Sequence, residues 1–322
     1  MKLYTYILHG EERVGGESSN GRIVDLLAAS GGDPVFSTMV SLIEAGDDGL
    51  AKCRKILAGY TPEQSHAKQD VVLGAPIPRP RTLRGFSVFE RHLRQSAEGA
   101  ARRLSASSPD PETAYHQIKT QMNLDKIPSP GWHATPCYYY MDHTCVTGSG
   151  TTVKWPSYSN WIDYELEIVA VIGKPGKDIA SSAASSHIFG YTLVNDLSAR
   201  DAQLKAMATG LGAGKGKDFE NSNPMGPCIV TADEIPDPYA LRARVFVNGE
   251  EWSDSDGREA AFRFDSCIAY ASQSQMLVSG DMLTTGTLPS SSSIELQREV
   301  KPGDTIEFDV EGIGKLVVTV AH

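Results

Sequence analysis

The second half of the chain carries the hydrophobic pattern of β-strands. From residue 136 onward, apolar and polar positions alternate, or apolar positions run together, over short stretches. The predicted strands are 164–173, 188–196, 243–252 and two strands within 302–320. Asn248-Gly249 interrupts one alternating stretch and predicts a tight hairpin turn. Helical spacing is confined to 198–208 and about 264–276, so this half is expected to consist mainly of strands.

The beginning of the chain combines short strands with helical spacing. Strands are predicted over 2–8 and 22–27, and apolar positions recur as on a helix over 38–60. Gly46 and Gly49 are placed to split that helical stretch into two shorter helices. This part therefore has the pattern of a small α+β unit.

A proline-rich connector follows. Pro76, Pro78 and Pro80 occupy alternate positions, which excludes a helix and favours an extended chain. We place a domain boundary at this connector, with a small N-terminal domain of residues 1–75 and a larger domain of residues 76–322.

The larger domain opens with a predicted helix and a polar stretch. Residues 86–104 have helical spacing, whereas 105–135 is rich in Ser, Pro and polar residues and predicts a long surface excursion. The fold class expected for the whole chain is therefore α+β and rich in strands. There is no internal repeat, and low complexity is limited to the serines at 290–293.

Charge and cysteine content narrow the classes of function. The 322 residues include 40 acidic and 30 basic side chains, for a net charge of -10, which argues against a nucleic-acid or anionic-membrane binder. The five cysteines contain no C-x-x-C pair, as expected for free thiols in a reducing compartment. The chain has neither the pattern of a signal peptide nor an apolar run of membrane-spanning length. We therefore expect a cytoplasmic protein.

Three acidic residues alternate at the start of a predicted buried strand. Asp163, Glu165 and Glu167 share one face of an extended chain, while Tyr164 and Leu166 face the core. Carboxylates at the mouth of a buried strand need a cation, and hard oxygen ligands suit Mg²⁺, Mn²⁺ or Ca²⁺. The alternative is a solvated acidic face of an antiparallel sheet.

A second group of polar residues follows the next strand. Asp196 or Ser198 suits the N-cap of a helix, and Arg200 and Gln203 lie three residues apart on one face of that helix. Such donors beside a helix start can bind an oxyanion or a carboxylate. A capped helix with a surface ion pair is the alternative.

The glycine-rich segment 210–219 carries Lys217. This segment lacks the ending of a phosphate-binding loop, but a lysine on it can reach into a cleft. On this segment alone, a flexible basic surface loop is the preferred interpretation.

Two further residues stand out because of their surroundings. His92 lies near the start of a predicted helix, and Glu295 lies within an apolar strand pattern after the polar segment 279–289. A structural histidine and a solvent-exposed glutamate on an edge strand are the alternatives.

Taken together and in this order, these segments resemble the fumarylacetoacetate hydrolase family over about residues 84–320. The matching strings are D-Y-E-L-E-x-x-x-V-I-G (163–173), G-Y-T-x-x-N-D-x-S-A-R-D-x-Q (190–203), K-D-F (217–219), G-P (226–227), V-N-G-E (247–250), S-G-D…T-G-T (279–287) and G-I-G-x-L (312–316). The resemblance implies a mixed β-roll C-terminal domain, usually dimeric, so we expect a homodimer.

The resemblance also implies a role for each candidate residue. Glu165, Glu167 and Asp196 would hold a divalent metal, usually Mg²⁺. Close relatives read R-D-F where this chain has Arg84-Gly85-Phe86, so three carboxylates rather than four are expected here.

The catalytic base of the family matches His92, and its carboxylate partner matches Glu295. In another branch of the family the partner is a glutamate at the position of Gln95. Arg200, Gln203 and Lys217 match catalytic donors that face the substrate, and Thr287 and Phe86 match substrate-binding positions.

The implied function is a metal-dependent hydrolase that cleaves a carbon–carbon bond in a 1,3-diketone or acylpyruvate-type 2-oxo acid, through activated water and a metal-bound enolate. Two alternatives stay open. One is a 2-oxo acid decarboxylase, isomerase or hydratase on the same platform, and the other is a catalytically silent binding protein. The excursion at 105–135 and the aromatic run 138–140 are expected to shape the pocket, with ordinary packing as the alternative.

Overall fold

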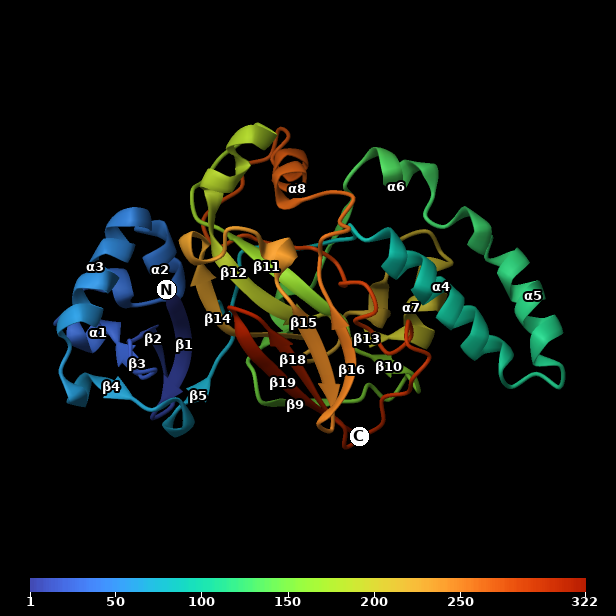
Figure 1. Cartoon of the computed structure of the whole chain (residues 1–322), viewed down its shortest axis with the longest axis horizontal. Coiled ribbons are helices and arrows are strands. Elements are labelled where there is room, and N and C mark those ends of the chain that lie inside the picture. The colour runs from blue at the N-terminus through green and yellow to red at the C-terminus, as the bar shows by residue number, and fades with distance from the viewer.

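The computed structural model describes residues 1–322. One large sheet runs through the centre of the molecule (Figure 1). The strand order is β4-β3-β2-β1-β14-β12-β11-β17-β6-β7, with β5 beside β1 and β8 beside β14. The bounds of its central strands are Asn223–Thr231 (β14), Ile188–Asn195 (β12), Leu166–Ile172 (β11), Met282–Thr284 (β17), Leu83–Phe86 (β6), Tyr138–Tyr140 (β7) and Val146–Thr147 (β8). All pairs from β14 to β17 are antiparallel, and β17 pairs with β6 in parallel.

Strand β11 is the centre of the core. Every one of its residues is buried, because side chains pack on both faces of the sheet. Leu166, Ile168 and Ala170 join the larger core cluster, whereas Val169 and Val171 join the smaller one. The apolar run after the acidic residues is thus a strand covered on both faces, as the sequence predicts.

The N-terminal strands extend this sheet rather than forming one of their own. They and the helices beside them are β1 (Lys2–Leu8), β2 (Glu11–Glu17), β3 (Ile23–Asp25), α1 (Leu26–Ala29), α2 (Met39–Glu44), α3 (Gly46–Gly59), β4 (Ser65–His66) and β5 (Val72–Leu73). Leu3 of β1 pairs with Ile229 of β14, which joins the two parts of the chain. The predicted break between helices occurs at Gly46, whose φ is +53°, whereas Gly49 lies inside α3. The division at residue 75 stays a prediction.

A second sheet packs beside the first. Its order is β16-β15-β18-β19-β9, with bounds Glu250–Ser255 (β16), Ala243–Val247 (β15), Thr305–Val310 (β18), Gly314–Ala321 (β19) and Thr151–Lys154 (β9). Asn248 and Gly249 have φ values of 52° and 82°, which is the backbone of a tight hairpin turn with two left-handed residues. The predicted hairpin is therefore confirmed. A two-stranded ladder joins β10 (Ile162–Asp163) to β13 (Ser198–Ala199).

The larger helices lie outside the sheets and differ in part from the predictions. Their bounds are Glu90–Ser105 (α4), Pro111–Gln121 (α5), Pro130–Ala134 (α6), Arg200–Met207 (α7) and Phe264–Ala271 (α8). The helix predicted from residue 86 begins at Glu90, because Leu83–Phe86 is strand β6 and the backbone N–H of Val88 then donates to Thr285. Pairing within the sheet thus overrides a local pattern that suits a helix.

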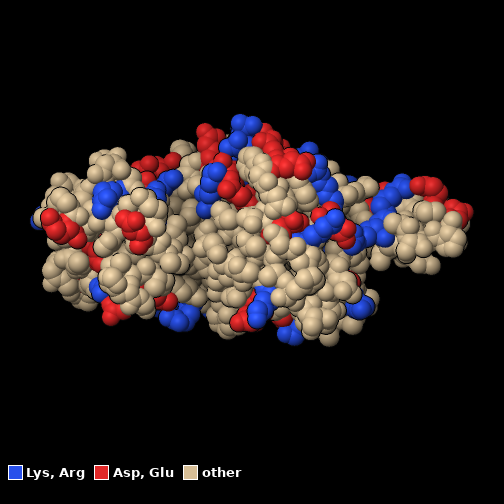
Figure 2. All heavy atoms as spheres, turned by 90° about the horizontal axis from the view of Figure 1, so that it is seen from below, with Lys and Arg blue, Asp and Glu red and all other residues tan.

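The polar segment 105–135 is a helical arm rather than an irregular loop. Asp110 caps α5 and Pro111 opens it, which are ordinary helix-start signals. Ala101 of α4 packs with Tyr115 and Leu124 in a small cluster. The arm formed by α4 and α5 stands out from the body in both views (Figures 1 and 2).

These features confirm an α+β fold that is rich in strands. All five cysteines are free thiols, and none of the helices combines the length and apolar content needed to cross a membrane. On the face shown in Figure 2, acidic and basic side chains are interspersed without a continuous basic field. That face lacks the basic patch typical of a nucleic-acid binder.

Helix α4 touches the backbone of the segment that carries Glu295, and Gly99 permits this contact. A Cβ atom at Gly99 would lie 2.1 Å from the carbonyl oxygen of Ile294. We predict that Gly99→Ala lowers the free energy of unfolding by about 1–3 kcal/mol, because the helix must shift. Urea unfolding measures the change.

Gly59 is the matched control, because it is helical and exposed, and a Cβ atom added there would meet no other atom within 4 Å. Gly59→Ala should leave stability unchanged or raise it by up to about 1 kcal/mol. Equal effects of the two substitutions would contradict the close contact.

Candidate active site

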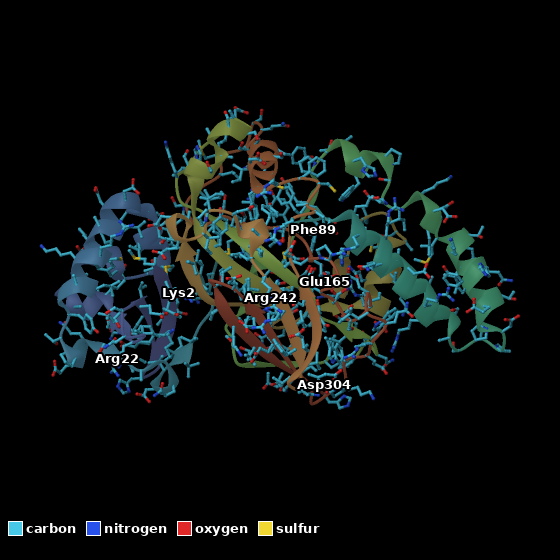
Figure 3. The ribbon with its side chains drawn as sticks, in the orientation of Figure 1. Lys2, Arg22, Phe89, Glu165, Arg242 and Asp304 are labelled. Carbon is cyan, nitrogen blue, oxygen red and sulfur yellow. The ribbon has the colours of Figure 1, made fainter.

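Three carboxylates meet in the interior of the molecule. Glu165 and Glu167 stand at the beginning of β11, and Asp196 follows the end of the neighbouring strand β12. The register places Leu166 opposite Asn195, which brings the acidic ends of the two strands together. One ligand atom from each of the three carboxylates lies within 4.8 Å of the others, and all three residues are buried. The cluster lies beside α4, as the position of Glu165 in Figure 3 shows.

Two cations face this cluster. The Lys217 ammonium lies 2.5 Å from Oε2 of Glu165 and 2.6 Å from Oδ2 of Asp196, and the guanidinium of Arg200 lies 2.7 Å from Oε1 of Glu165. Burial opposes ionisation of Glu165, but Arg200 and Lys217 outweigh it and hold the pKa of Glu165 far below its usual range. Glu165 is therefore an anion at neutral pH.

The remaining carboxylate oxygens are suited to a metal ion. Oε2 of Glu167 and Oδ1 of Asp196 are buried and have no hydrogen-bond partner. Burial, together with the carboxylates of Asp196 and Glu165, raises the pKa of Glu167 well above its usual range. Because unpartnered buried carboxylate oxygens are costly, the donor set fits a hard divalent cation.

Asp163 has a structural position rather than a place in the cluster. The strand breaks between β10 and β11, and Asp163 turns to accept hydrogen bonds from the backbone N–H groups of Ser293 and Ile294. Its Oδ2 lies 2.8 Å from Nη2 of Arg200. Asp163 and Glu165 both contact Nη2 of Arg200, whereas the carboxylates close enough to share one metal ion are Glu165, Glu167 and Asp196. The carboxylate of Asp163 thus fixes the guanidinium against Glu165.

His92 connects the cluster to Glu295. Nδ1 of His92 lies 3.2 Å from Oε2 of Glu295, and Nε2 lies 3.7 Å from Oε1 of Glu165. Burial lowers the pKa of His92, but the carboxylates of Glu295 and Glu165 outweigh it and raise the pKa above its ordinary value. When Nδ1 donates to Glu295, Nε2 of the neutral ring is an acceptor directed towards the cluster. The geometry is that of a base with a carboxylate partner.

Two serines donate the hydrogen bonds that hold Glu295 in this pair. The side chain of Glu295 is fully buried, and it accepts hydrogen bonds from the backbone N–H of Ser290 at 3.0 Å and from Oγ of Ser292 at 2.7 Å. Residues 293–297 form turns rather than the predicted strand. The segment pairs with the chain beside β11 only at Ser292, which bridges Glu165, and its other polar groups bind Glu295 and Asp163. Gln95 lies nearby and accepts from Oγ of Ser290 at 3.2 Å.

Helix α7 and the glycine-rich loop position the remaining donors. Nη1 of Arg200 donates to Oε1 of Gln203 at 3.0 Å, which leaves the NH₂ group of the Gln203 amide as a donor. The backbone at Gly216 packs so closely on Gln203 that a Cβ there would lie 2.3 Å from Cβ of Gln203. This contact directs Lys217 inward, and the residue is only 5% exposed. The preference for a flexible surface loop is therefore wrong at Lys217.

The predicted cap of α7 also differs. Neither Asp196 nor Ser198 caps the helix: the N-cap position is Ala199. Ser198 belongs to strand β13, and the carboxylate of Asp196 is turned into the cluster.

Thr287 and Phe86 are both buried. Thr287 is buried in the segment after β17, where the backbone of Thr285 bridges Ile168 and Val88. Phe86 is buried in the larger core and its ring packs against Tyr138, with centroids 5.1 Å apart. Their roles in substrate binding stay predictions.

Tyr139 is a site residue that the sequence motifs did not reveal. Its hydroxyl donates to Oδ2 of Asp196 at 2.6 Å. The available signal was the aromatic run 138–140, whose successive members must face opposite sides of β7, so that Tyr139 faces away from Tyr138 and Tyr140. The low-complexity serines at 290–293 were a second missed signal, because their hydroxyl and backbone groups bind Glu295 and Asp163.

A comparison with known families shows to which family this chain belongs. Residues 112–321, well over half of the chain, match the family model described as "Fumarylacetoacetate (FAA) hydrolase C-terminal". The chain belongs to the fumarylacetoacetate hydrolase family. The resemblance inferred from the sequence motifs is thereby confirmed.

Two relatives that align with nearly the whole chain are named as oxaloacetate tautomerases. The chain is 28% identical over 313 residues to oxaloacetate tautomerase Fahd2a, mitochondrial, of Rattus norvegicus, a match that covers 95% of this chain and 87% of that protein. It is 27% identical over 310 residues to human oxaloacetate tautomerase FAHD2A, mitochondrial, with 94% and 86% covered.

Solved structures share the family fold. A fumarylacetoacetate hydrolase from Exiguobacterium antarcticum aligns with a TM-score of 0.74 at 21% identity, covering 100% of this chain and 99% of that one. The maleylpyruvate hydrolase of Sphingobium sp. SYK-6 in complex with manganese(II) ion and pyruvate aligns with a TM-score of 0.73 at 21% identity and the same coverage. Proteins of this fold thus include ones named as hydrolases and as an isomerase.

The pairing of His92 with Glu295 predicts a measurable titration. In metal-free protein, ¹H–¹⁵N NMR should give His92 a pKa above its ordinary value of 6.5. Glu295→Gln should lower that pKa, because burial still disfavours the imidazolium while its main anionic partner is gone. Glu299→Gln, which alters an exposed pair with Arg103, is the control.

The same pair contributes stability that depends on pH. Because the folded-state pKa of His92 is raised, the stabilisation is fully present below pH 6.5 and is lost as pH rises through the folded-state pKa. The stability advantage of wild type over Glu295→Gln should therefore shrink as pH rises. An unchanged His92 pKa in Glu295→Gln would contradict the pairing.

Proposed function

We propose that this protein is a divalent-metal-dependent hydrolase that cleaves a carbon–carbon bond in a 1,3-diketone or an acylpyruvate-type 2-oxo acid. The observation that supports this most directly is the buried pair of His92 and Glu295, with Nε2 of His92 on the side of the carboxylate cluster. A carboxylate-supported imidazole can remove a proton from water. Hydrolysis requires that step.

The metal would be held by Glu165, Glu167 and Asp196. A bound Mg²⁺ or Mn²⁺ acts as a Lewis acid on the substrate oxygens and stabilises negative charge that develops on them. The charge balance supports the assignment. Four buried carboxylates, these three and Asp163, face the two cations Lys217 and Arg200, and one divalent ion would neutralise the excess. Mn²⁺ is also the ion named for the maleylpyruvate hydrolase of the same fold.

The residues around the cluster have different roles in the proposed reaction. His92 accepts a proton from water at Nε2, and Glu295 stabilises the resulting imidazolium. The free amide NH₂ of Gln203 provides a donor for an oxyanion. Lys217, whose three N–H groups bind Glu165 and Asp196, and Arg200, fixed by Asp163, add positive charge beside it. Loss of one such donor costs about 3 kcal/mol of transition-state stabilisation. Protonated His92 then returns its proton to the carbon that leaves.

A second candidate is an oxaloacetate keto–enol tautomerase. It is favoured by the two relatives named as such, whose alignments cover at least 94% of this chain. Tautomerisation needs only proton transfer next to a carbonyl, so His92 would move a proton between carbon and oxygen without activating water. The two candidates differ in whether solvent oxygen enters the product.

The functional test uses purified protein with Mn²⁺ or Mg²⁺, a series of acylpyruvates and 1,3-diketones, and oxaloacetate. We predict carbon–carbon cleavage with ¹⁸O from labelled water in the carboxylate product. His92→Ala should lower the cleavage rate by about 10²–10⁴-fold. Glu295→Gln should lower it less, and Gln95→Ala should have little effect because Gln95 contacts Ser290 rather than His92.

His116→Ala is the control for loss of a histidine, because His116 is exposed on α5. Enol decay of oxaloacetate, followed by ultraviolet absorbance, measures the second candidate on the same samples. Fast enol decay without cleavage or ¹⁸O incorporation would replace the hydrolase by the tautomerase. Neither activity in wild type would contradict both.

A further inference from the structure

Tyr139 occupies space that exists only because residue 85 is glycine. Gly85 of β6 pairs directly with Tyr139 of β7 in the antiparallel register. A Cβ atom at Gly85 would lie 2.7 Å from Cε1 of Tyr139 and 3.1 Å from Cγ and Sδ of Met141. The distance to Tyr139 is shorter than real Cβ contacts, so any side chain at this position must displace the tyrosine ring. The backbone of Gly85 is not in the left-handed region, and the requirement is therefore one of space.

The ring that fills this space carries its hydroxyl to the carboxylate cluster. Tyr139 donates to Oδ2 of Asp196 at 2.6 Å, and Lys217 donates to the same oxygen at 2.6 Å. The other oxygen, Oδ1, is buried and has no hydrogen-bond partner. Two donors thus fix one oxygen of Asp196 and leave the second free.

This arrangement restricts how Asp196 can bind a cation. An aspartate with both oxygens free can rotate or bind through either oxygen, whereas one anchored by two donors offers a single oxygen in a fixed direction. The hydroxyl is neutral, so it anchors Asp196 without adding a negative charge to a site that already contains three carboxylates. Lys217 cannot replace it, because the ammonium is shared with Glu165.

We propose that Tyr139 is a positioning residue for the metal site. Its hydroxyl holds Asp196 so that Oδ1 faces the cation, and the absence of a side chain at Gly85 makes room for the Tyr139 ring. The inference rests on the metal site of the proposed function. It assigns a task to two residues outside the metal-ligand set and the His92–Glu295 pair. Partners that orient a metal ligand typically contribute about 10–100-fold to metal affinity.

The test is isothermal titration of Mn²⁺ into the full chain after chelator treatment and removal of the chelator. Tyr139→Phe keeps the ring and removes only the hydroxyl, and it should raise the Mn²⁺ dissociation constant by about 10–100-fold. Tyr140→Phe is the matched control, because Tyr140 is the next residue of β7 and its side chain is exposed. The Mn²⁺ dissociation constant of Tyr140→Phe should stay within about twofold of wild type.

Gly85→Ala is an independent perturbation that retains the hydroxyl but displaces the ring, and it should also weaken Mn²⁺ binding. If it acts through Tyr139, adding Gly85→Ala to Tyr139→Phe should change the affinity by less than about twofold. Thermal unfolding of each metal-free variant separates loss of fold from loss of binding. A site-specific loss of affinity in a variant that melts with wild type supports positioning, which a purely structural role would not produce.

The outcomes separate this inference from the function on which it rests. Wild type that fails to bind Mn²⁺ would overturn the metal site and the positioning role together. Wild type that binds, with Tyr139→Phe binding equally well, would overturn only the role of Tyr139. A full effect of Gly85→Ala in the Tyr139→Phe background would show that the glycine acts by another route and would overturn that part of the inference.

Discussion

Burial of a carboxylate costs several kcal/mol unless a cation or hydrogen-bond donors compensate it. Besides Glu295, which pairs with His92, this chain buries four of them in one neighbourhood: Asp163, Glu165, Glu167 and Asp196. Much of the surrounding structure serves that compensation. Arg200 bridges Asp163 and Glu165, Lys217 bridges Glu165 and Asp196, and Tyr139 donates to Asp196. Only Glu167 and one oxygen of Asp196 are left with unpartnered atoms, and these define where a divalent cation completes the balance.

The acidic cluster lies at one end of a strand whose remainder is apolar on both faces. Strand β11 leaves the acidic cluster and enters the core directly, where all its residues from Leu166 to Ile172 are buried. Sheet partners β12 and β17 fix the direction of the acidic end. Helix α4 then brings His92 from the opposite side, and its contact at Gly99 places it against the segment that carries Glu295. Core packing and catalytic geometry are therefore set by the same elements.

Patterns that depend on neighbouring positions in the sequence predicted much of this structure. The alternation at 163–173 indicated a buried strand with acidic residues at its mouth, and Asn248-Gly249 indicated the hairpin. The resemblance of ordered motifs indicated the family, and with it residues that the structure brings together, including His92, Glu165 and Glu295. These signals are local or motif-based and need no knowledge of tertiary contacts.

The predictions from sequence were wrong where tertiary contacts override a local pattern. Residues 86–89 suit a helix, but Phe86 pairs with Tyr138 of β7 and the backbone N–H of Val88 donates to the carbonyl oxygen of Thr285, so α4 begins only at Glu90. Glu295 suits a strand, but Ser290 and Ser292 bind its carboxylate within a turn. The role of Tyr139 depends on its pairing with Gly85 across β6 and β7, which no local spacing specifies. Contacts of this kind join segments whose separation in the sequence is large, so only the folded structure shows them.

The account depends most on a divalent cation at the three carboxylates. The most direct measurement is an anomalous difference map from crystals of the protein soaked in Mn²⁺, with Mg²⁺-soaked crystals as the reference. The account predicts one strong Mn²⁺ peak per chain, in contact with Glu165, Glu167 and Asp196. No peak at these residues under saturating Mn²⁺, or a peak confined to surface carboxylates, would contradict it.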